Sequence, residues 1–534
     1  MPCGTSWNFT EKDPTPPRSQ PQRLTVKPQT HPQALCYFSK ASYSPKGSVD
    51  LVANLPELAR DLSAMVETDY RHGYGYDAAV DGKKYQPDYG SDENLENGVE
   101  KGRSTSVSNK GKEDPFGDET NSEVKYRTMA WWQAGMIMIA ETISLGILSL
   151  PSVLAAIGIA PGVILIVGLG ILATYTGFVI GQFKLAYPHV HNMADAGEVM
   201  AGRWGREIFG GAQILFLVFV MGSHILTFSI MLNVLTGHGT CTIVFGFVGF
   251  LVCLICTLPR TLKRVSYMAI VSFISIIAAV VITMAGVGIE RPGDGKVDVA
   301  VKSNLYKGWL SLTIFSGHVA FFSFISELKH PEQYPKALFL LQGVDTSMYL
   351  IVAVVTYRYA GTSVASPALG STSPLLQKIA YGIAIPTIVI AGVINGHVAA
   401  KYIYVRLFRG TDRMSKKSWS SFGLWAIIVL VLWIIAWIIA EAIPVFNDLL
   451  SLISALFASW FTYGLSGVFW LYMNYGRYRE NGRKMFLTGL NAVIFCIGAA
   501  ICGLGLYASG TAIHADATSS NGSFSCADNS KSSA

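Results

Sequence analysis

Residues 135–158 read GMIMIAETISLGILSLPSVLAAIG, an apolar run long enough to span a membrane and interrupted at its centre. About 18 to 20 apolar residues are enough to carry a helix across the hydrocarbon core of a bilayer. Here the centre of the run holds the small residues Thr142, Ser144 and Gly146, and Pro151 follows. This pattern predicts a membrane helix that is discontinuous near mid-depth and exposes backbone polar groups there.

Runs of the same kind extend from residue 129 to residue 507. The chain has 534 residues, of which 51% are hydrophobic and 14% are charged, whereas a soluble domain carries about 25% charged residues. Backbone amides in lipid need internal partners, so the runs must be helices or strands of a closed barrel. They lack the period-2 alternation of barrel strands. The fold class expected is an all-α polytopic membrane protein.

The length criterion predicts about eleven transmembrane helices. Residues 1–128 are expected to form a cytoplasmic, largely disordered N-terminal head, residues 129–507 the transmembrane domain, and residues 508–534 a short extracytoplasmic C-terminal tail, whose Ser, Ala and Asn content favours disorder. No apolar run opens the chain, so the first span is expected to serve as the targeting signal. The spans expected are 129–157, 162–185, 208–235, 242–258, 265–289, 309–328, 338–361, 375–407, 422–440, 445–472 and 485–507.

The basic residues of the short loops predict the orientation, because Lys and Arg are concentrated in cytoplasmic loops. One set of loops carries most of them, including Arg203, Arg260, Arg409, Arg413 and Arg477, and this set is placed in the cytoplasm with the head. An odd number of spans then places the C-terminal tail outside. The tail contains the glycosylation sequon Asn-Gly-Ser at residues 521–523, which agrees with that side.

The predicted sixth span repeats the pattern of the first. Its centre, residues 311–323, reads SLTIFSGHVAFFS, again small polar residues around a glycine. Small residues also let helices pack closely, which is the alternative for either span alone. Two interrupted spans five apart have opposite directions in the membrane, as in a five-plus-five inverted repeat with its binding site at the repeat interface. We therefore expect both first and sixth helices to be discontinuous.

Three stretches resemble the amino acid/auxin permease family, and in particular fungal neutral amino-acid permeases of the methyltryptophan-resistance type. The resemblance covers about residues 126–507 and implies a leucine-transporter-like fold with secondary active symport, usually of protons, and neutral aliphatic or aromatic amino acids as substrates. It does not extend to the head. The stretches are residues 135–158, FSGHVAFFSFISELKHPEQYPKAL at 315–338 and DTSMYLIVAVVTYRYAG at 345–361.

With that fold, the backbone at the two interruptions is expected to bind the substrate. N–H groups of the outer half of the first span would hold the carboxylate, and carbonyls of the sixth span the ammonium, since half-helix ends carry partial charges of opposite sign. Gly146 and Gly317 would permit close approach, and helix packing is the alternative for each. The substrate-binding residues expected are Ser144, Leu145, Gly146 and Ile147 in the first span, and Phe315, Ser316, Gly317 and His318 in the sixth.

Ionisable groups inside a membrane span are costly and are therefore candidates for function. Glu141 and Asp345 are the candidates for proton coupling, and a neutral or paired structural carboxyl is the alternative for each. His318 could relay protons or only form hydrogen bonds, while His224 and His397 are expected to pack. We expect no cofactor and no metal, with H⁺ as the coupling ion and Na⁺ left open.

The substrate and partners follow from the same residues. No acidic residue clearly positioned to hold a cationic side chain stands beside the sixth-span break, which mildly disfavours lysine or arginine as substrate. The aromatics Phe228, Phe315, Phe321 and Phe322 could line an apolar pocket or simply pack. The partners expected are a small-molecule amino acid, the lipid bilayer and regulators of the head, with no nucleic acid. The plasma membrane is favoured over the vacuolar membrane.

Two other classes stay open: an amino-acid-sensing receptor or channel on the same scaffold, and, with less support, a membrane enzyme. No disulfide framework is expected among the cysteines, and those inside spans are expected to pack. Cys3 and Cys36 lie in the head, Cys253, Cys256, Cys496 and Cys502 lie in apolar runs, and Cys241 and Cys526 stand alone.

Overall fold

The computed structural model describes Phe116 and residues 123–293, 296–301, 317–409, 411–416, 418–443, 446–519 and 523–531. Contacts divide the chain into two units, Met1–Glu96 and Asn97–Ala534. The first unit, and with it most of the predicted head, lies outside the described residues. In the described part of the second unit the secondary structure is helical, apart from one isolated bridge between Met129 and Leu328.

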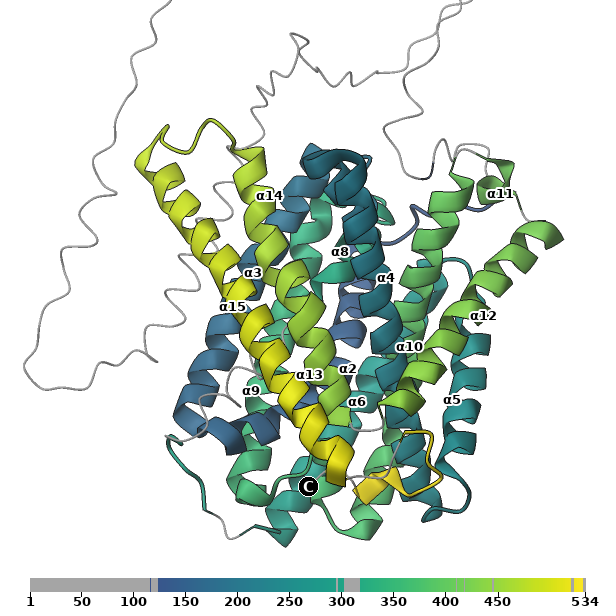
Figure 1. Cartoon of the computed structure of the whole chain (residues 1–534), viewed down its shortest axis with the longest axis vertical. Coiled ribbons are helices and arrows are strands. Elements are labelled where there is room, and N and C mark those ends of the chain that lie inside the picture. Colours follow the sequence, from purple (N-terminus) through teal and green to yellow (C-terminus); the bar gives the residue numbers. More distant parts are fainter. Residues whose placement is uncertain are drawn as a thin grey trace, which may run out of the picture. The chain divides into compact units, whose positions relative to one another are not determined.

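Long helices lie side by side and form a bundle (Figure 1). Most are apolar on more than one face, which suits burial in lipid as well as in protein. The helices are α2 (Trp131–Ile157), α3 (Ile159–Ala186), α4 (Met193–Thr236), α5 (Thr242–Thr257), α6 (Leu262–Glu290), α8 (Phe321–Ser326), α9 (Tyr334–Ala360), α10 (Pro374–Phe408), α11 (Asp412–Ser415), α12 (Trp419–Ala442), α13 (Phe446–Ile453), α14 (Leu465–Met473) and α15 (Gly482–Ser519).

The predicted spans agree with these helices. In the described part of the chain, eight helices are long and apolar enough to cross a membrane, and the bent α2 makes nine. α5, with 16 residues, is the short fourth span. The tenth span consists of α13, a π-helix at Ser454–Gly464 and α14. Of the sixth span only the second half is described, and it contains α8. Each predicted span thus coincides with a described helix or with part of one.

α4 begins earlier than the predicted span at 208–235. Its backbone leaves the helical conformation at Ala201 and Gly202, and Gly202 has φ 59° and ψ −146°, a combination that glycine tolerates far better than other residues. Across this kink, a Cβ on Gly197 or on Gly205 would lie 2.4 Å or 2.2 Å from the other residue's carbonyl oxygen. The residues before the kink therefore form a separate short helix, and the membrane span starts after it.

The helices pack in two groups. α2, α3, α8 and α9 contact one another and are called the α2 group here. α4, α5, α10 and α12 form the second, the α4 group, and α6 contacts members of both. Because the site predicted from the sequence lies on α2 and the sixth span, the α2 group carries it and the α4 group faces it.

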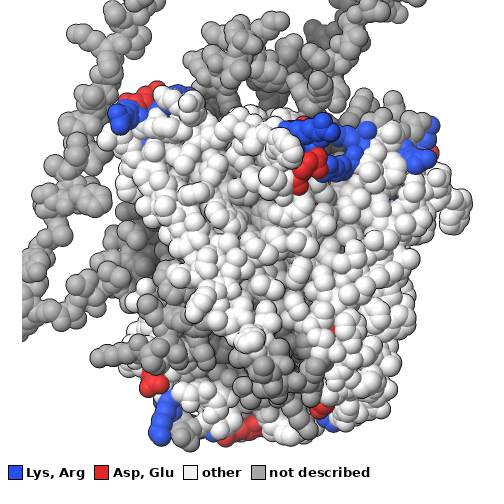
Figure 2. Space-filling view, in the orientation of Figure 1, with Lys and Arg blue, Asp and Glu red and all other residues white. Residues whose placement is uncertain are grey.

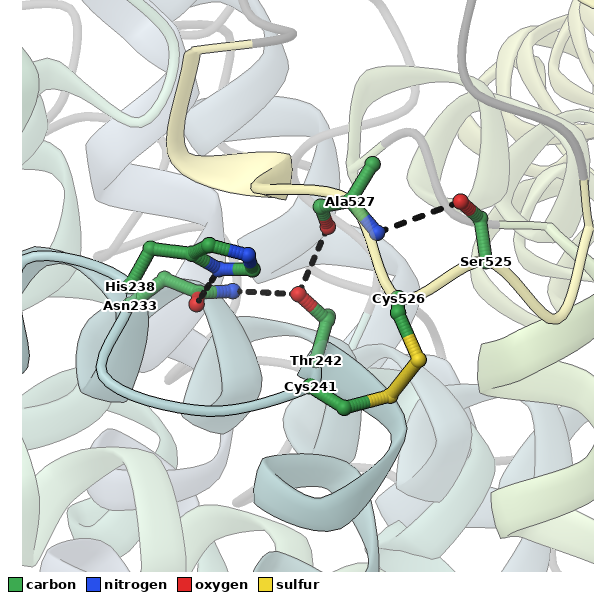
Figure 3. The surroundings of a disulfide bond; sticks show 7 residues. All are labelled: Asn233, His238, Cys241, Thr242, Ser525, Cys526 and Ala527. Carbon is green, nitrogen blue, oxygen red and sulfur yellow. Dashed lines mark hydrogen bonds between the residues drawn. A yellow bond between two sulfur atoms is a disulfide. The ribbon is translucent and has the colours of Figure 1, made fainter.

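The C-terminal segment differs from its prediction. α15 continues to Ser519 instead of ending near residue 507, and Cys526 forms a disulfide with Cys241 (Figure 3). The prediction that Cys241 and Cys526 stand alone is therefore wrong. The prediction that the tail is disordered is wrong for residues 508–519 and 523–531. The pairing depends on where α15 returns the chain, and sequence spacing does not reveal that.

Residues 523–531, called the C-terminal strap, bind the ends of three helices. The Asn233 amide donates to the hydroxyl of Thr242 at 2.8 Å, and that hydroxyl donates to the carbonyl of Ala527 at 2.6 Å (Figure 3). The N–H of Phe524 donates to the carbonyl of Glu441 at 3.0 Å. The strap therefore joins α4, α5 and α12 at the end of the bundle where the chain terminates.

Candidate substrate and coupling site

The first span bends where the sequence predicts its interruption. Trp131–Ile143 and Gly146–Ile157 meet at an angle of 46°. The backbone is helical on both sides and through Ser144 and Leu145. Pro151 contributes to the bend, because its ring lacks an N–H and crowds the carbonyl of Ile147 four residues earlier.

The sixth span is described from Gly317 onwards. Gly317 has φ −98° and ψ 6°, one turn of 3₁₀-helix follows at His318–Ala320, and α8 begins after it. Phe315 and Ser316, whose carbonyls were expected to receive the substrate ammonium, lie outside the described residues. The short 3₁₀ turn and six-residue helix differ from a regular membrane helix, as a discontinuous span requires.

Gly317 lies directly against the bend of α2. A Cβ built on Gly317 would lie 2.2 Å from Cγ2 of Thr142 and 3.0 Å from Oε2 of Glu141. Contacts that short do not occur between real side chains, so this position requires glycine because of close approach. The structure therefore brings together the two spans that the sequence singled out, while the substrate-binding roles of their residues stay a prediction.

An acidic group lies beside the sixth-span break. Glu141 is close to Gly317, which the order of residues within each span could not reveal, because it depends on how α2 packs against the sixth span. Whether this carboxyl is positioned to hold a cationic side chain depends on its protonation, and the prediction that cationic substrates are disfavoured stays a prediction.

Glu141 and Asp345, the two coupling candidates, come from α2 and α9 and interact electrostatically. Oδ1 of Asp345 and Oε2 of Glu141 are buried and have no hydrogen-bond partner within the described residues. Two ionised carboxylates in one buried site repel each other, and an unpaired buried charge is costly. The arrangement is therefore suited to holding at least one proton.

Thr142 connects Asp345 to the bend. Its hydroxyl lies 2.7 Å from Oδ2 of Asp345 and 2.9 Å from the carbonyl of Met138. The carbonyl of Thr142 itself accepts a hydrogen bond of 2.8 Å from the hydroxyl of Tyr349, one turn beyond Asp345 on α9. From the sequence, Thr142 was recognised only as one of the small residues at the interruption of the first span, and Tyr349 was not recognised. The signal available for Tyr349 was its four-residue spacing from Asp345, which places the two on one helix face.

His318 is fixed by hydrogen bonds to α3. Its Nε2 donates to the carbonyl of Ala173 at 2.9 Å and lies 3.5 Å from the hydroxyl of Thr176. Its ring packs on Phe321, with ring centroids 4.4 Å apart. These contacts agree with the hydrogen-bonded role that was one of its two alternatives.

The two other histidines, His224 and His397, pack inside the α4 group. Nδ1 of His224 donates to the carbonyl of Ile388 at 2.8 Å, and the ring of His397 packs on Trp425 with centroids 5.3 Å apart. Of the aromatics, Phe322 packs on Phe469. These contacts favour packing over a lining of the site.

Comparison with known proteins gives matches of two kinds. The model of the family described as "Transmembrane amino acid transporter protein" matches residues 127–511. The chain is 37% identical over 398 residues to a Neurospora crassa protein, "N amino acid transport system protein", covering 72% of this chain and 85% of that one. It is 33% identical over 426 residues to a "Transmembrane transporter" of Gibberella moniliformis, covering 76% and 89%.

Among solved structures, the chain is similar to Mhp1, a nucleobase-cation-symport-1 family transporter, in a closed conformation with bromovinylhydantoin bound. The TM-score is 0.50 at 14% identity, covering 78% of this chain and 99% of that one. At such identity the similarity concerns the fold alone. It confirms the predicted leucine-transporter-like architecture.

Proposed function

Because the chain belongs to the transmembrane amino acid transporter family, we propose that it is a proton-coupled symporter of neutral amino acids that works by alternating access. The observation that carries the proposal is the hydrogen bond between Thr142 and Asp345, next to Glu141 at the contact of α2 with the sixth span. A coupling group must bind and release its proton where the substrate site forms, and these side chains lie beside the position proposed for that site.

The geometry at Asp345 suits both protonation states. When Asp345 is ionised, the hydroxyl of Thr142 donates to its Oδ2. When Asp345 carries the proton, it can donate to the oxygen of Thr142, whose own proton then turns to the carbonyl of Met138 at 2.9 Å. A hydroxyl has one proton and can also accept, so no hydrogen bond to Asp345 is lost in either state. Such a site can load and release a proton without rearranging its helices.

The proposed substrate position follows from the ends of the bent helices. In the proposed site, the half of α2 that begins at Gly146 would offer its N-terminal N–H groups to the substrate, and such groups favour an anionic carboxylate. The ammonium would then lie toward the sixth span, on the side of Gly317. Because Glu141 takes part in proton binding, it offers no standing charge for a cationic side chain. We therefore propose neutral aliphatic and aromatic amino acids as substrates, with no bound cofactor.

The test is uptake of a labelled neutral amino acid by reconstituted vesicles, with many amino acids as competitors at two pH values. An imposed inward proton gradient should drive accumulation, and neutral amino acids should compete better than lysine or arginine. Uptake that ignores the proton gradient overturns the coupling, and uptake that follows a sodium gradient assigns Na⁺ instead. Binding without accumulation would favour the receptor or channel.

The proposed orientation places the disulfide outside the cytoplasm. Lys and Arg gather along the upper edge of the bundle, over the loops that follow α10 and α14, and are fewer at the lower edge (Figure 2). The upper edge is called the basic end, and the opposite edge, with Cys241 and Cys526, the disulfide end. Disulfides persist in oxidising compartments, and Lys and Arg favour the cytoplasmic side. Both features support a cytoplasmic head, which regulators in the cytoplasm would reach. We propose the plasma membrane as its location, with the vacuolar membrane as the alternative.

Glycosylation and labelling with an impermeant reagent test this orientation. The sequon at Asn521 lies five residues before Cys526 in the sequence, so it should carry a glycan if the disulfide end faces the lumen during synthesis. Asn521→Gln should abolish the mobility shift that glycosidase produces in the parent protein. A parent chain without glycan, labelled at the C-terminus by an impermeant reagent from the cytoplasmic side, would reverse the topology.

A further inference from the structure

A buried ion pair closes the basic end of the bundle. The ammonium of Lys401 on α10 donates to the carboxylate of Glu327, which directly follows α8. The side chain of Lys401 is 2% exposed and that of Glu327 is 0% exposed. Buried ion pairs add little net stability compared with apolar side chains, although removal of one partner is strongly unfavourable. A pair in this position therefore calls for a role other than stabilisation.

Tyr126, just before α2, covers the pair. The ammonium of Lys401 lies 4.9 Å from the centre of the Tyr126 ring, within the range of a cation–π interaction. Burial raises the pKa of Tyr126 to about 12, so its phenol stays protonated and donates to the carbonyl of Met414 at 3.3 Å. The hydroxyl also accepts from Arg260 at 3.4 Å. The hydroxyl of Tyr126 thus contacts α11 and the connection between α5 and α6.

Glu327 and Tyr126 are both attached to the α2 group. The segments around Met129 and Leu328 pair as an isolated bridge: the N–H of Met129 donates to the carbonyl of Glu327 at 3.1 Å, and the N–H of Lys329 donates to the carbonyl of Met129 at 2.9 Å. This bridge joins the start of α2 to the end of α8. Both helices are members of the α2 group, so Tyr126 and Glu327 move with it.

The partners of Glu327 and Tyr126 belong to the α4 group and its loops. Lys401 lies on α10, and Arg260 donates to the hydroxyl of Tyr404, also on α10, at 3.1 Å. The hydroxyl of Tyr404 in turn donates to the carbonyl of Arg413, at 2.8 Å, in the connection from α10 to α12. These contacts stay within the α4 group and its loops. The ion pair and these hydrogen bonds of the Tyr126 hydroxyl therefore cross from one helix group to the other.

We propose that Glu327, Lys401 and Tyr126 form the gate that closes the basic end, and that the ion pair separates when the site opens to that side. The proposal rests on the alternating-access function proposed above. In the closed state the charges are dry and compensate each other. In the open state water solvates both, so separation does not leave a bare buried charge. Loss of one partner removes the attraction of the pair, which acts only in the closed state, and therefore shifts the protein toward the open state.

The test measures access from the basic end to a cysteine placed behind the gate. Ser323 on α8, 1% exposed, is replaced by cysteine in a full-length chain that keeps only Cys241 and Cys526 of its own cysteines. An impermeant maleimide is applied to each face of membrane vesicles in turn, without any gradient. Glu327→Gln and Lys401→Met should each raise labelling from the basic side by about fivefold or more. The combined exchange Glu327→Lys with Lys401→Glu should return labelling toward the parent value.

Two controls separate gating from damage. Tyr126→Leu should raise labelling while Tyr126→Phe, which keeps the ring over Lys401, should raise it less. Glu207→Gln removes an exposed ion pair to Arg406 that joins α4 to α10 within one helix group, and should leave labelling unchanged. All values are taken relative to protein that reaches the membrane with its disulfide formed.

Unchanged labelling in both single charge variants, or equal labelling in the charge exchange and the single variants, would overturn the gate. A gate defect should also raise KM for substrate supplied at the disulfide end, whereas general damage lowers only the maximal rate. If uptake proved independent of protons while labelling behaved as described, the proposed coupling would fail and the gate would stand.

Discussion

Thr142→Val removes one hydroxyl while preserving the shape of the side chain. In the parent, that hydroxyl lies 2.7 Å from Oδ2 of Asp345, and the other oxygen of Asp345 has no described hydrogen-bond partner. In the variant, the carboxyl of Asp345 therefore loses the one hydrogen bond that the structure gives it. We expect this loss to be felt more by the ionised carboxylate than by the protonated acid.

The magnitude follows from the difference between two hydrogen bonds. A bond to a charged group contributes about 1.5 to 3 kcal/mol, and a neutral bond about 0.5 to 1.5 kcal/mol. The variant should therefore favour the proton-bound form of the site by about 1 to 1.5 kcal/mol more than the parent does. Since 1.36 kcal/mol corresponds to one pH unit, the pH of half-maximal uptake should rise by about one unit.

The assay is initial uptake by reconstituted vesicles across a pH series, with Thr142→Ser as the matched control because serine keeps the hydroxyl. The serine variant should follow the parent profile, and substrate binding at low pH should be unchanged in both. If the valine profile overlays that of the parent, or if valine and serine shift it equally, Thr142 does not tune proton binding at Asp345.

Three further predictions concern the same molecule. Gly317→Ala should abolish uptake, because its Cβ would lie 2.2 Å from a side chain of α2 and overpacking of this kind costs about 1 to 3 kcal/mol; Gly343→Ala, with nothing within 4 Å, should keep parent uptake, and equal activity of the two would contradict the close approach. Glu141→Gln should weaken the response of uptake to an imposed proton gradient more than it weakens substrate binding, and a pH profile identical to that of the parent would make Glu141 structural. Cys526→Ser should lower the apparent melting temperature of the purified protein, since a disulfide that closes so long a loop contributes about 2 to 4 kcal/mol; an unchanged melting curve would show that the strap is held by its hydrogen bonds alone.

The number and order of the membrane helices could be predicted from the sequence. Hydropathy and run length are local properties, and lipid forces each sufficiently apolar run to form its backbone hydrogen bonds internally. The bend of α2 could be predicted for the same reason, because Gly146 and Pro151 act on the backbone of their own helix. The kink at Gly202 and the extension of α15 were missed, since the residues there are neither apolar enough nor interrupted enough to be recognised.

Only part of the chemistry of the candidate site could be predicted from the sequence. Glu141 and Asp345 stand out because a carboxyl inside a span is costly wherever it lies. That Thr142 bonds to Asp345, and that Gly317 lies against Glu141, depends on how α2, the sixth span and α9 pack. A hydroxyl is common in membrane helices, so Thr142 gave no signal of a role beside Asp345.

The sequence alone determined that this chain crosses a membrane many times, that its first span departs from a straight helix near Gly146, and that costly carboxyls lie within its spans, because each of these is a property of neighbouring residues. Tertiary structure alone decided which groups meet. Thr142 and Asp345 are separated by 203 residues, Lys401 and Glu327 by 74, and Cys241 and Cys526 by 285. Such pairs form because helix packing brings their Cα atoms within reach, and no local pattern of side chains encodes that distance.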